Sequence, residues 1–274
     1  MKFQGILICT DLDGTLLRKD KTVSPENLEA IDYFKARGGL FTLITGRMPY
    51  FISNRGIYEA VKPNAPIGCI NGGGIYDLCT GKYFWTQELA RSALTLAKYT
   101  QNIIPEIGVQ VNTFDAVYFC KESSAMETFR KITGTPNIPR RYEEIREPIA
   151  KIVFGDHNEQ NILQLQRLLG EHPLSGDFDF IRSEKMLYEI LPKGICKGTA
   201  LKKLAQILHI PKTKTVAVGD YHNDISMLRE AGLGVAVANA TPEAQAAADY
   251  ITVSNEEHAI AALVSDLESG KIRL

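Results

Sequence analysis

The chain has 274 residues, 45% of them hydrophobic, which is enough for one large domain or two ordinary domains with buried cores. Lysine and arginine (31) nearly balance aspartate and glutamate (32), so the net charge of -1 excludes a general positive field for nucleic acid or an anionic membrane. An acidic ligand must therefore be bound by local groups.

The first elements form a β-α-β unit. Residues 5–10 (Gly-Ile-Leu-Ile-Cys-Thr) are apolar and β-rich, which is typical of a central strand of a parallel sheet. Residues 24–26 (Ser-Pro-Glu) can cap and begin a helix that should run to Arg37, where two glycines end it. A second β-rich run follows at 40–44, so the two strands are predicted to be parallel.

The pattern changes after a predicted helix at 49–61 and a third strand at 67–70, which stops at the glycine turn 71–74. A hairpin is expected at 75–85, and the chain up to about residue 191 mixes helices with short alternating strands. The helices are predicted at 89–101 and 158–169, and the strands at 109–113, 117–119, 149–154 and 187–191.

The β-α alternation returns after Pro192. It predicts a helix at 197–208, a strand at 215–218, a helix through Met227, a strand at 233–237 and helices at 242–248 and 258–268. The simplest fold is α/β: a Rossmann-like parallel-sheet core in three α/β/α layers, made from residues 1–83 and 192–274. An inserted α+β domain of roughly 100 residues, 84–191, interrupts it.

Four polar clusters follow predicted strands or begin a predicted helix. They are Asp11/Asp13, Thr45-Gly46-Arg47, Lys197-Gly198 and the run 219–224 (Gly-Asp-Tyr-His-Asn-Asp). Residues just past different strands of a parallel sheet converge at one edge, so four acids, a hydroxyl and a lysine are expected in one site. Four carboxylates repel a phosphate unless a divalent cation neutralises some of them, and oxygen ligands suit Mg²⁺. With Lys197 and Thr45 as phosphate donors, the set favours phosphoryl transfer.

Each cluster alone also has a purely structural explanation. Asp-Leu-Asp-Gly occurs as a turn, a lysine in a helix is commonly solvated, and Asp220 and Asn223 are good helix caps. These explanations do not account for the joint arrangement, in order, with every cluster at a strand end or a helix start.

The joint arrangement resembles the haloacid dehalogenase (HAD) superfamily phosphatases, in the Cof-type branch (class IIB) with a large α/β cap domain between the second and third motifs. The matching motifs are Asp-Leu-Asp-Gly-Thr-Leu at 11–16, Leu-Ile-Thr-Gly-Arg at 43–47, Lys197, and Gly-Asp-x-x-Asn-Asp-x-x-Met at 219–227. The resemblance runs the length of the chain and includes Asn71-Gly72-Gly73 before the cap.

The resemblance implies a role for each motif residue. Asp11 would be the nucleophile that becomes an aspartyl phosphate, and Asp13 the general acid and base. Asp11, Asp220 and the backbone carbonyl of Asp13 would hold Mg²⁺, with Asp224 binding or orienting it. The phosphoryl oxygens would be held by Thr45 and Lys197. Contacts to the substrate are further expected from Leu12, Gly46, Arg47 and Asn223.

Several alternatives stay open at this point. Arg47 can contact substrate through two hydrogen bonds or pair with a local acid. A phosphomutase would use the same aspartyl phosphate, and a non-catalytic sensor of phosphometabolites would keep the same site. For a phosphatase the default substrate is a sugar phosphate, followed by a nucleotide-like or cofactor phosphate. Monomer and homodimer are equally compatible with the sequence.

The cysteines and the amino terminus bear on the compartment. The five cysteines are widely spaced and form no CxxC pair, which favours buried or incidental thiols in a reducing cytosol. Residues 1–5 lead directly into the first strand without a signal-type segment. The sequence also has no unbroken run of about 18 apolar residues, the length that is needed to span a bilayer. We expect a cytoplasmic protein whose partner is a small phosphorylated metabolite, with no nucleic acid and no membrane.

Overall fold

The structure is a computed structural model that describes residues 2–53 and 56–274. The chain divides into two compact units, and we describe each by itself. The core unit comprises Met1–Thr86 and Cys196–Leu274, and the cap unit comprises Gln87–Ile195. The sequence predicts these boundaries after residues 83 and 191.

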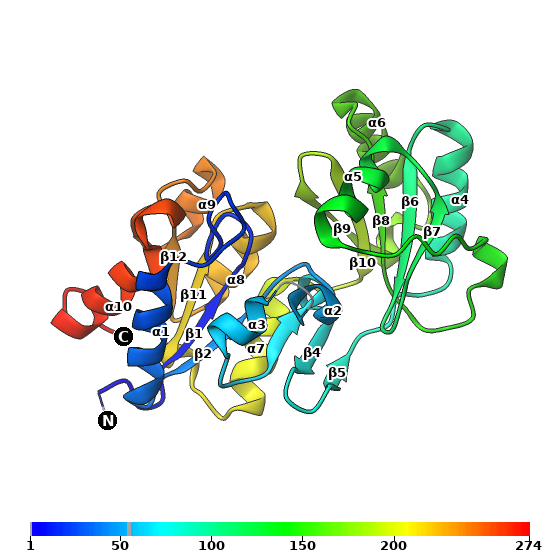
Figure 1. Ribbon diagram of the computed structural model, residues 1–274. Helices are drawn as coiled ribbons and strands as arrows, with labels where there is room; N and C mark the ends of the chain where they lie inside the picture. Colours follow the sequence, from blue (N-terminus) through cyan, green and yellow to red (C-terminus); the bar gives the residue numbers. More distant parts are fainter. Residues whose placement is uncertain (1, 54–55) are drawn as a thin grey trace. The chain divides into compact units, whose positions relative to one another are not determined.

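The core unit is built on a five-stranded parallel sheet with the order β13-β12-β11-β1-β2 (Figure 1). Its strands are β1 (Leu7–Thr10), β2 (Leu40–Leu43), β11 (Thr215–Gly219), β12 (Leu233–Ala236) and β13 (Tyr250–Ile251). All four residues of β1 are buried, and Leu7 pairs with Thr215 on one side and with Leu40 on the other. The apolar character of this strand thus reflects its place between two neighbours and two helical layers.

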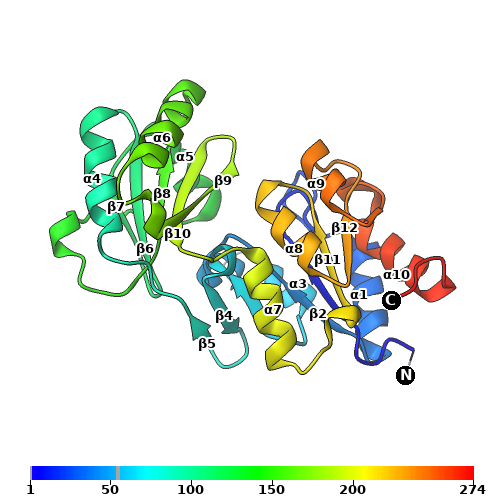
Figure 2. The same ribbon diagram turned by 180° about the vertical axis from the view of Figure 1, so that it is seen from behind.

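Helices cover both faces of this sheet, as expected for a three-layer α/β/α core. In Figure 1, α1 (Pro25–Ala36) and α10 (Ala259–Ser269) lie in front of the sheet; in Figure 2, α7 (Lys197–Ile207) and α8 (Ile225–Glu230) do. The short helix α9 (Pro242–Ala247) packs against α8 and β12. The start of α1 is as predicted: the Ser24 hydroxyl accepts the backbone N–H of Asn27, and Pro25 is the first helical residue.

The rest of the amino-terminal segment departs in part from expectation. Strands β3 (Ile67–Cys69), β4 (Gly74–Asp77) and β5 (Lys82–Thr86) form a separate antiparallel sheet, which meets the main sheet through a parallel bridge between Ile44 and Gly68. The single helix predicted at 49–61 is wrong. The chain forms α2 (Pro49–Ser53) and α3 (Ile57–Val61), and Gly56, which immediately precedes α3, has a left-handed backbone, φ 65°, that a continuous right-handed helix cannot contain. Residues 54 and 55 of that prediction lie outside the described residues.

The cap unit is an antiparallel sheet with the order β7-β6-β8-β10-β9. Its strands are β6 (Gly108–Thr113), β7 (Val117–Lys121), β8 (Ile149–Gly155), β9 (Phe178–Glu184) and β10 (Leu187–Pro192). Helices α4 (Ala93–Ile103) and α6 (Glu159–Glu171) pack on one face around buried side chains that include Leu96, Phe154 and Leu165. This is the α+β pattern that the sequence predicted for the insertion.

Two cap elements were not predicted. One is α5 (Ser124–Thr133), although its signals are present: the Ser123 hydroxyl accepts the N–H of Met126 at the start, and Gly134 ends the helix with φ 72°. The other is β9, an edge strand that pairs with β10 alone in this sheet. Most of its residues are only half-buried, so its hydrophobic pattern is weak.

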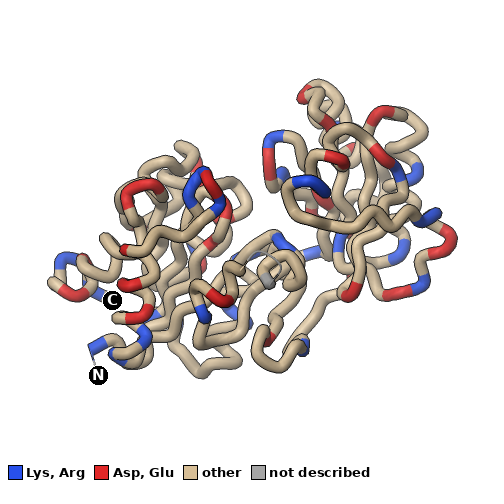
Figure 3. Tube along the Cα trace, viewed as in Figure 1, with Lys and Arg blue, Asp and Glu red and all other residues tan. Residues whose placement is uncertain are grey.

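Charged residues of both signs are interspersed along the chain of each unit (Figure 3), in keeping with the small net charge. Among the residues that the structure describes, no helix has the length and apolarity required to cross a membrane.

Candidate active site

The centre of the candidate site is Asp11, the first residue after the central strand β1. Its backbone N–H donates to the carbonyl of Val218 in β11 at 2.9 Å, which continues the sheet pairing by one residue. Its side chain is buried. A carboxylate at this position costs free energy unless a cation or hydrogen-bond donors compensate it.

Lys197 supplies that compensation from the first residue of α7. Its Nζ donates to Asp11 Oδ1 at 2.7 Å and to Asp224 Oδ1 at 2.5 Å, and only 1% of its side chain is exposed. Burial disfavours the ammonium form, but the charges of Asp11 and Asp224 outweigh burial and raise the pKa of Lys197. The lysine is therefore a fixed positive charge between two carboxylates.

Asp220 and Asp224 follow the neighbouring strand β11. The second oxygen of Asp224, Oδ2, accepts the backbone N–H groups of Asp220 and Tyr221 at 2.9 and 3.0 Å. The hydroxyl of Thr15 donates to Asp220 Oδ1 at 2.7 Å. One carboxylate oxygen each of Asp11, Asp220 and Asp224 lie within 4.8 Å of one another. Sequence positions that are more than 200 residues apart thus meet at one edge of the sheet.

This cluster carries an excess of negative charge. Burial, followed by the charge of Asp224, raises the pKa of Asp220 to about 6, although Thr15 and Lys197 oppose the shift. Burial also raises the pKa of Asp11, against the opposing charge of Lys197, and the three neighbouring aspartates add to the increase. Three carboxylates around one ammonium group form a set of hard oxygen donors that is suited to a divalent cation.

Asp13 stands apart from this cluster and is held by two cations. Arg47 donates through Nε to Oδ2 at 2.9 Å and through Nη2 to Oδ1 at 2.8 Å, and Lys21 Nζ donates to Oδ1 at 2.8 Å. Burial opposes ionisation, but the charge and hydrogen bonds of Arg47 and the hydrogen bond of Lys21 lower the pKa of Asp13 to about 2. Arg47 therefore pairs with a local acid, which is one of its two alternatives, and its contact with substrate stays a prediction.

The remaining predicted residues lie around these groups. The buried hydroxyl of Thr45 accepts the backbone N–H of Arg47 at 3.2 Å. Asn223 Nδ2 donates to Asn71 Oδ1 at 3.1 Å, and a Cβ at Gly46 would lie 2.9 Å from that same oxygen. The side chain of Leu12 is fully buried in the core. A substrate contact by Leu12 would therefore have to come from its backbone.

Sequence reasoning missed three residues that contact the site. Thr15 lies within the motif at 11–16 and Asn71 within the turn before the cap, so the sequence contains a signal for both residues. Lys21 carries no such signal, because it lies in a polar loop beside another lysine, Lys19.

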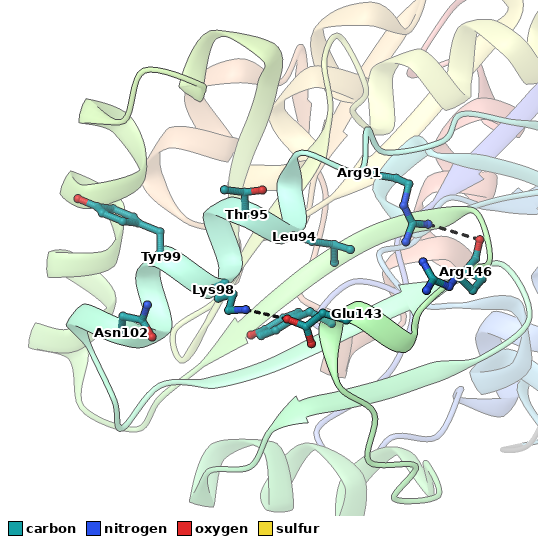
Figure 4. Close-up of a pocket in the computed structure, with 9 residues that line it drawn as sticks. Arg91, Leu94, Thr95, Lys98, Tyr99, Asn102, Glu143 and Arg146 are labelled. Carbon is teal, nitrogen blue, oxygen red and sulfur yellow. Dashed lines mark hydrogen bonds and ion pairs between the residues drawn. The ribbon is translucent and has the colours of Figure 1, made fainter.

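A separate groove of about 660 Å³ lies on the cap unit between α4 and the segment around residues 142–146 (Figure 4). Lys98 Nζ pairs with Glu143 Oε1 at 2.7 Å across it, and Arg91 donates to the backbone carbonyls of Ile145 and Arg146. Exposed pairs of this kind stabilise little. None of the residues predicted for catalysis lines this groove.

The fold and the site together define an α/β enzyme with an acidic site, suited to a metal, at the carboxyl edge of its parallel sheet. Residues 8–264 match the family model of haloacid dehalogenase-like hydrolases. The chain belongs to this family.

The chain matches individual relatives over nearly their whole length, which supports this assignment. The chain is 30% identical to YxeH of Bacillus subtilis (strain 168), covering 97% of this chain and 99% of that protein. It is also 30% identical to the 5-amino-6-(5-phospho-D-ribitylamino)uracil phosphatase YwtE of the same organism, covering 96% and 98%. A haloacid dehalogenase-like hydrolase from Bacteroides thetaiotaomicron has the same fold, with a TM-score of 0.84 and 24% identity over 96% of this chain and 99% of that chain.

The predicted resemblance to the HAD superfamily is thereby confirmed, and so is the predicted fold class. The chain is a HAD-type phosphatase, that is, a phosphoric monoester hydrolase that acts on small phosphorylated metabolites. Membership of this family implies a divalent metal, with which the cluster of Asp11, Asp220 and Asp224 is consistent.

Proposed function

We propose that the protein is a Mg²⁺-dependent phosphatase that hydrolyses a small phosphorylated metabolite, in the first instance a sugar phosphate, through an aspartyl phosphate on Asp11. The observation that carries the proposal is the pattern of hydrogen bonds to the two carboxylate oxygens of Asp11. Lys197 holds Oδ1, while among the described residues no donor lies on Oδ2. A carboxylate that is fixed through one oxygen and open at the other is suited to attack phosphorus.

In the first step Asp11 Oδ2 attacks the phosphorus, and the bond from phosphorus to the ester oxygen breaks. The negative charge of the bound phosphate ester raises the pKa of Asp13 again, and Asp13, protonated in that complex, gives its proton to the departing oxygen, so the alcohol leaves neutral. The products of this step are the free alcohol, an ionised Asp13 and a phosphoryl group on Asp11. Arg47 and Lys21 stabilise the ionised form of Asp13.

In the second step a water molecule gives a proton to Asp13 and attacks the phosphorus. The bond from phosphorus to Asp11 breaks, inorganic phosphate leaves, and Asp11 is restored as a carboxylate. Asp13 therefore acts as acid and then as base at a single position. Lys197 stays beside Asp11 throughout and stabilises negative charge on the phosphoryl oxygens, together with the Thr45 hydroxyl.

The residues present fit a divalent cation. Asp220 Oδ2 is an acceptor oxygen of the cluster to which no described residue donates, whereas both oxygens of Asp224 are occupied. We therefore assign Asp11, Asp220 and the backbone carbonyl of Asp13 as ligands and Asp224 as the residue that orients them. Bound there, Mg²⁺ would neutralise the carboxylates and polarise the phosphoryl group.

Support for the substrate class comes from the relatives. YwtE is named for a substrate that bears a phosphorylated ribityl chain, which is a sugar-derived alcohol. Sugar phosphates and polyol phosphates together form the narrowest class that includes both the substrate of YwtE and the sugar phosphate that we expect for this protein. Leu12, Gly46, Arg47 and Asn223 remain our candidates for substrate contacts.

The test is phosphate release from p-nitrophenyl phosphate and from a panel of sugar, polyol, nucleotide and cofactor phosphates, with Mg²⁺ or with a chelator. The wild type should be active only with the metal. Asp11→Asn should lose nearly all activity while it stays folded, and Asp32→Asn, an exposed acid of α1 outside the site, should retain full activity. Full activity of Asp11→Asn would refute the mechanism.

The same assay separates the two alternatives. A phosphomutase would need a phosphorylated activator and would return the group to the sugar, so release of phosphate without an activator excludes it. A sensor would bind metabolites without turnover. The presence of both a nucleophile and a proton donor favours the phosphatase, because a binding protein requires neither.

A further inference from the structure

Asp13 has an asymmetric set of hydrogen bonds. A carboxylate offers about two lone-pair positions on each oxygen. Oδ1 accepts from both Lys21 and Arg47, at 2.8 Å each, whereas Oδ2 accepts from Arg47 at 2.9 Å. Among the described residues, the free position on this carboxylate is therefore on Oδ2.

The asymmetry is due to Lys21. The guanidinium group of Arg47 donates one hydrogen bond to each oxygen, so by itself it leaves one free position on either side. Arg47 alone thus fixes the plane of the carboxylate but does not distinguish its two oxygens. The ammonium group of Lys21 occupies the second position of Oδ1 and makes the distinction.

The backbone places Lys21 for this contact. Residues 18–22 form a tight turn in the dark-blue loop between β1 and α1 (Figure 1): Lys21 N donates to Arg18 O, and Arg18 N donates to Thr22 O, both at 2.9 Å. Lys21 has a left-handed backbone, φ 64°, a conformation that is unfavourable for a residue with a Cβ. The turn is further held by the Thr22 N–H on Asp20 Oδ1, so this conformation is imposed by several hydrogen bonds.

The loop is also anchored to the carboxyl-terminal part of the core unit. Lys19 N donates to Glu256 Oε1 at 2.7 Å, and Asn255 Nδ2 donates to the carbonyl of Leu17 at 2.9 Å. These hydrogen bonds hold the backbone of the loop in place, and they restrict the positions that the Lys21 side chain can reach.

From this geometry we infer that Lys21 is a positioning residue: it occupies Oδ1 of Asp13 and so presents Oδ2 as the oxygen that passes the proton to the leaving alcohol. The inference rests on the proposed function, because it assumes that Asp13 is the proton donor. It assigns Lys21 no contact with the substrate. Without Lys21, either oxygen is equally open, and the carboxylate is held by Arg47 alone. The lost hydrogen bond would also raise the pKa of Asp13 and favour proton uptake, so a loss of proton delivery can come only from lost positioning.

The test is the dependence of the rate on the leaving group. Aryl phosphates of similar size but graded leaving-group pKa are suitable: p-nitrophenyl, phenyl and p-methylphenyl phosphate. A p-nitrophenolate leaves readily without a proton, whereas a p-methylphenolate needs one. Impaired proton delivery in Lys21→Met should therefore leave kcat/KM for the p-nitrophenyl ester within about twofold and lower that for the p-methylphenyl ester about tenfold or more.

Two further variants complete the design. Lys21→Arg keeps a cation of similar reach and should return the leaving-group dependence toward that of the wild type. Lys19→Met removes a neighbouring lysine that contacts Glu256 through its backbone N–H rather than through its side chain, and this variant should behave as the wild type. Circular dichroism and Mg²⁺-dependent stabilisation report whether each variant is folded.

Each outcome bears on the inference. A steeper dependence on the leaving group in Lys21→Met, absent in Lys19→Met, supports it. An equal loss for all three esters would mean that Lys21 binds substrate or holds the loop, and no loss would mean that Asp13 is positioned without it; either result overturns the inference. If the wild type hydrolyses none of the esters, the proposed function itself has failed. That result is distinct from one in which all variants are active and depend on the leaving group to the same extent.

Discussion

Lys197 and Asp224 form an ion pair that is buried on both sides: Nζ lies 2.5 Å from Oδ1, and the side chains are 1% and 0% exposed. The same Nζ lies 2.7 Å from Asp11 Oδ1. Removal of one partner of a buried pair leaves an uncompensated charge, which is far more costly than the loss of a surface pair. Lys197 is therefore expected to matter for folding as well as for phosphate binding.

We expect Lys197→Met to lower the free energy of unfolding of the metal-free protein by about 3–5 kcal/mol, because Asp11 and Asp224 lose their counter-charge. Urea denaturation followed by circular dichroism measures this. The matched control is Lys202→Met on the same helix, where Lys202 pairs with Glu230 at the surface, and a change below about 1 kcal/mol is expected there. Equal losses in the two variants would contradict the role given to burial.

Mg²⁺ should stabilise the protein by binding the folded state alone. At a hundredfold excess over the dissociation constant the gain is about 2.7 kcal/mol, which raises the melting temperature. Asp220→Asn should lose most of this shift, whereas Asp32→Asn should keep it. Thermal melts with Mg²⁺ and with a chelator give the comparison, and a full shift in Asp220→Asn would exclude this carboxylate as a ligand.

The metal-free form of Asp220→Asn provides a second check. The pKa of Asp220 is raised from 3.8 to about 6, so its contribution to stability is complete below about pH 4 and is lost as the pH rises through 6. At pH 7 the ionised group opposes folding, and a neutral amide removes that cost. Without metal, Asp220→Asn should melt no lower than the wild type, and a clearly lower melting temperature would contradict the pKa assignment.

Gly72 lies in the turn before the cap unit, and we expect its substitution to have a strong effect on stability. Its backbone is left-handed, φ 105°, and a Cβ there would lie 2.0 Å from the carbonyl oxygen of Cys196. Because Cys196 precedes Lys197, Gly72→Ala should displace the site as well as destabilise the fold, by more than about 3 kcal/mol. The control is Gly270→Ala, where φ is 76° and nothing lies within 4 Å of the added Cβ, so only the backbone cost of about 1–2 kcal/mol is expected. Urea denaturation distinguishes the two, and similar losses would show that the close approach to Cys196 is relieved cheaply.

The sequence predicts the central arrangement because strand ends of a parallel sheet share one edge. Asp11 and Asp220 each follow an apolar run that is long enough to identify as a strand, and that is sufficient to bring them together. The broken helix at 49–61 was not predicted, since a glycine within a helical pattern is often tolerated. Only the local backbone, left-handed at Gly56, shows that one helix cannot run through this position.

The contacts of Asp13 mark the limit of such reasoning. Lys19 and Lys21 are equivalent in the sequence, two lysines in one polar loop. Which of them reaches Asp13 depends on the left-handed conformation at Lys21 and on hydrogen bonds to distant residues such as Glu256. Side-chain contacts that depend on an unusual backbone angle have no periodic pattern and emerge only with the structure.

A pH-dependent contribution to stability is expected from Glu147 in the cap unit. The Tyr118 hydroxyl donates to its Oε1 at 2.7 Å and the Arg146 N–H to its Oε2 at 2.9 Å. The hydrogen bond from Tyr118 and those from the backbone lower the pKa of Glu147 from 4.5 to about 2. A lowered pKa means that the carboxylate stabilises the folded state fully above about pH 4.5 and that this contribution is lost as the pH falls through 2.

Glu147→Gln should therefore melt below the wild type at pH 7, and the two melting curves should converge as the pH is lowered toward 2. The difference at pH 7 should stay below about 1 kcal/mol, because the side chain is 37% exposed and solvent screens its interactions. Glu106→Gln, which removes the same charge from an exposed position in the same unit, is the control and should show no such convergence. A difference in melting temperature between wild type and Glu147→Gln that grows as the pH falls would be opposite to the expected change and would contradict the lowered pKa of Glu147.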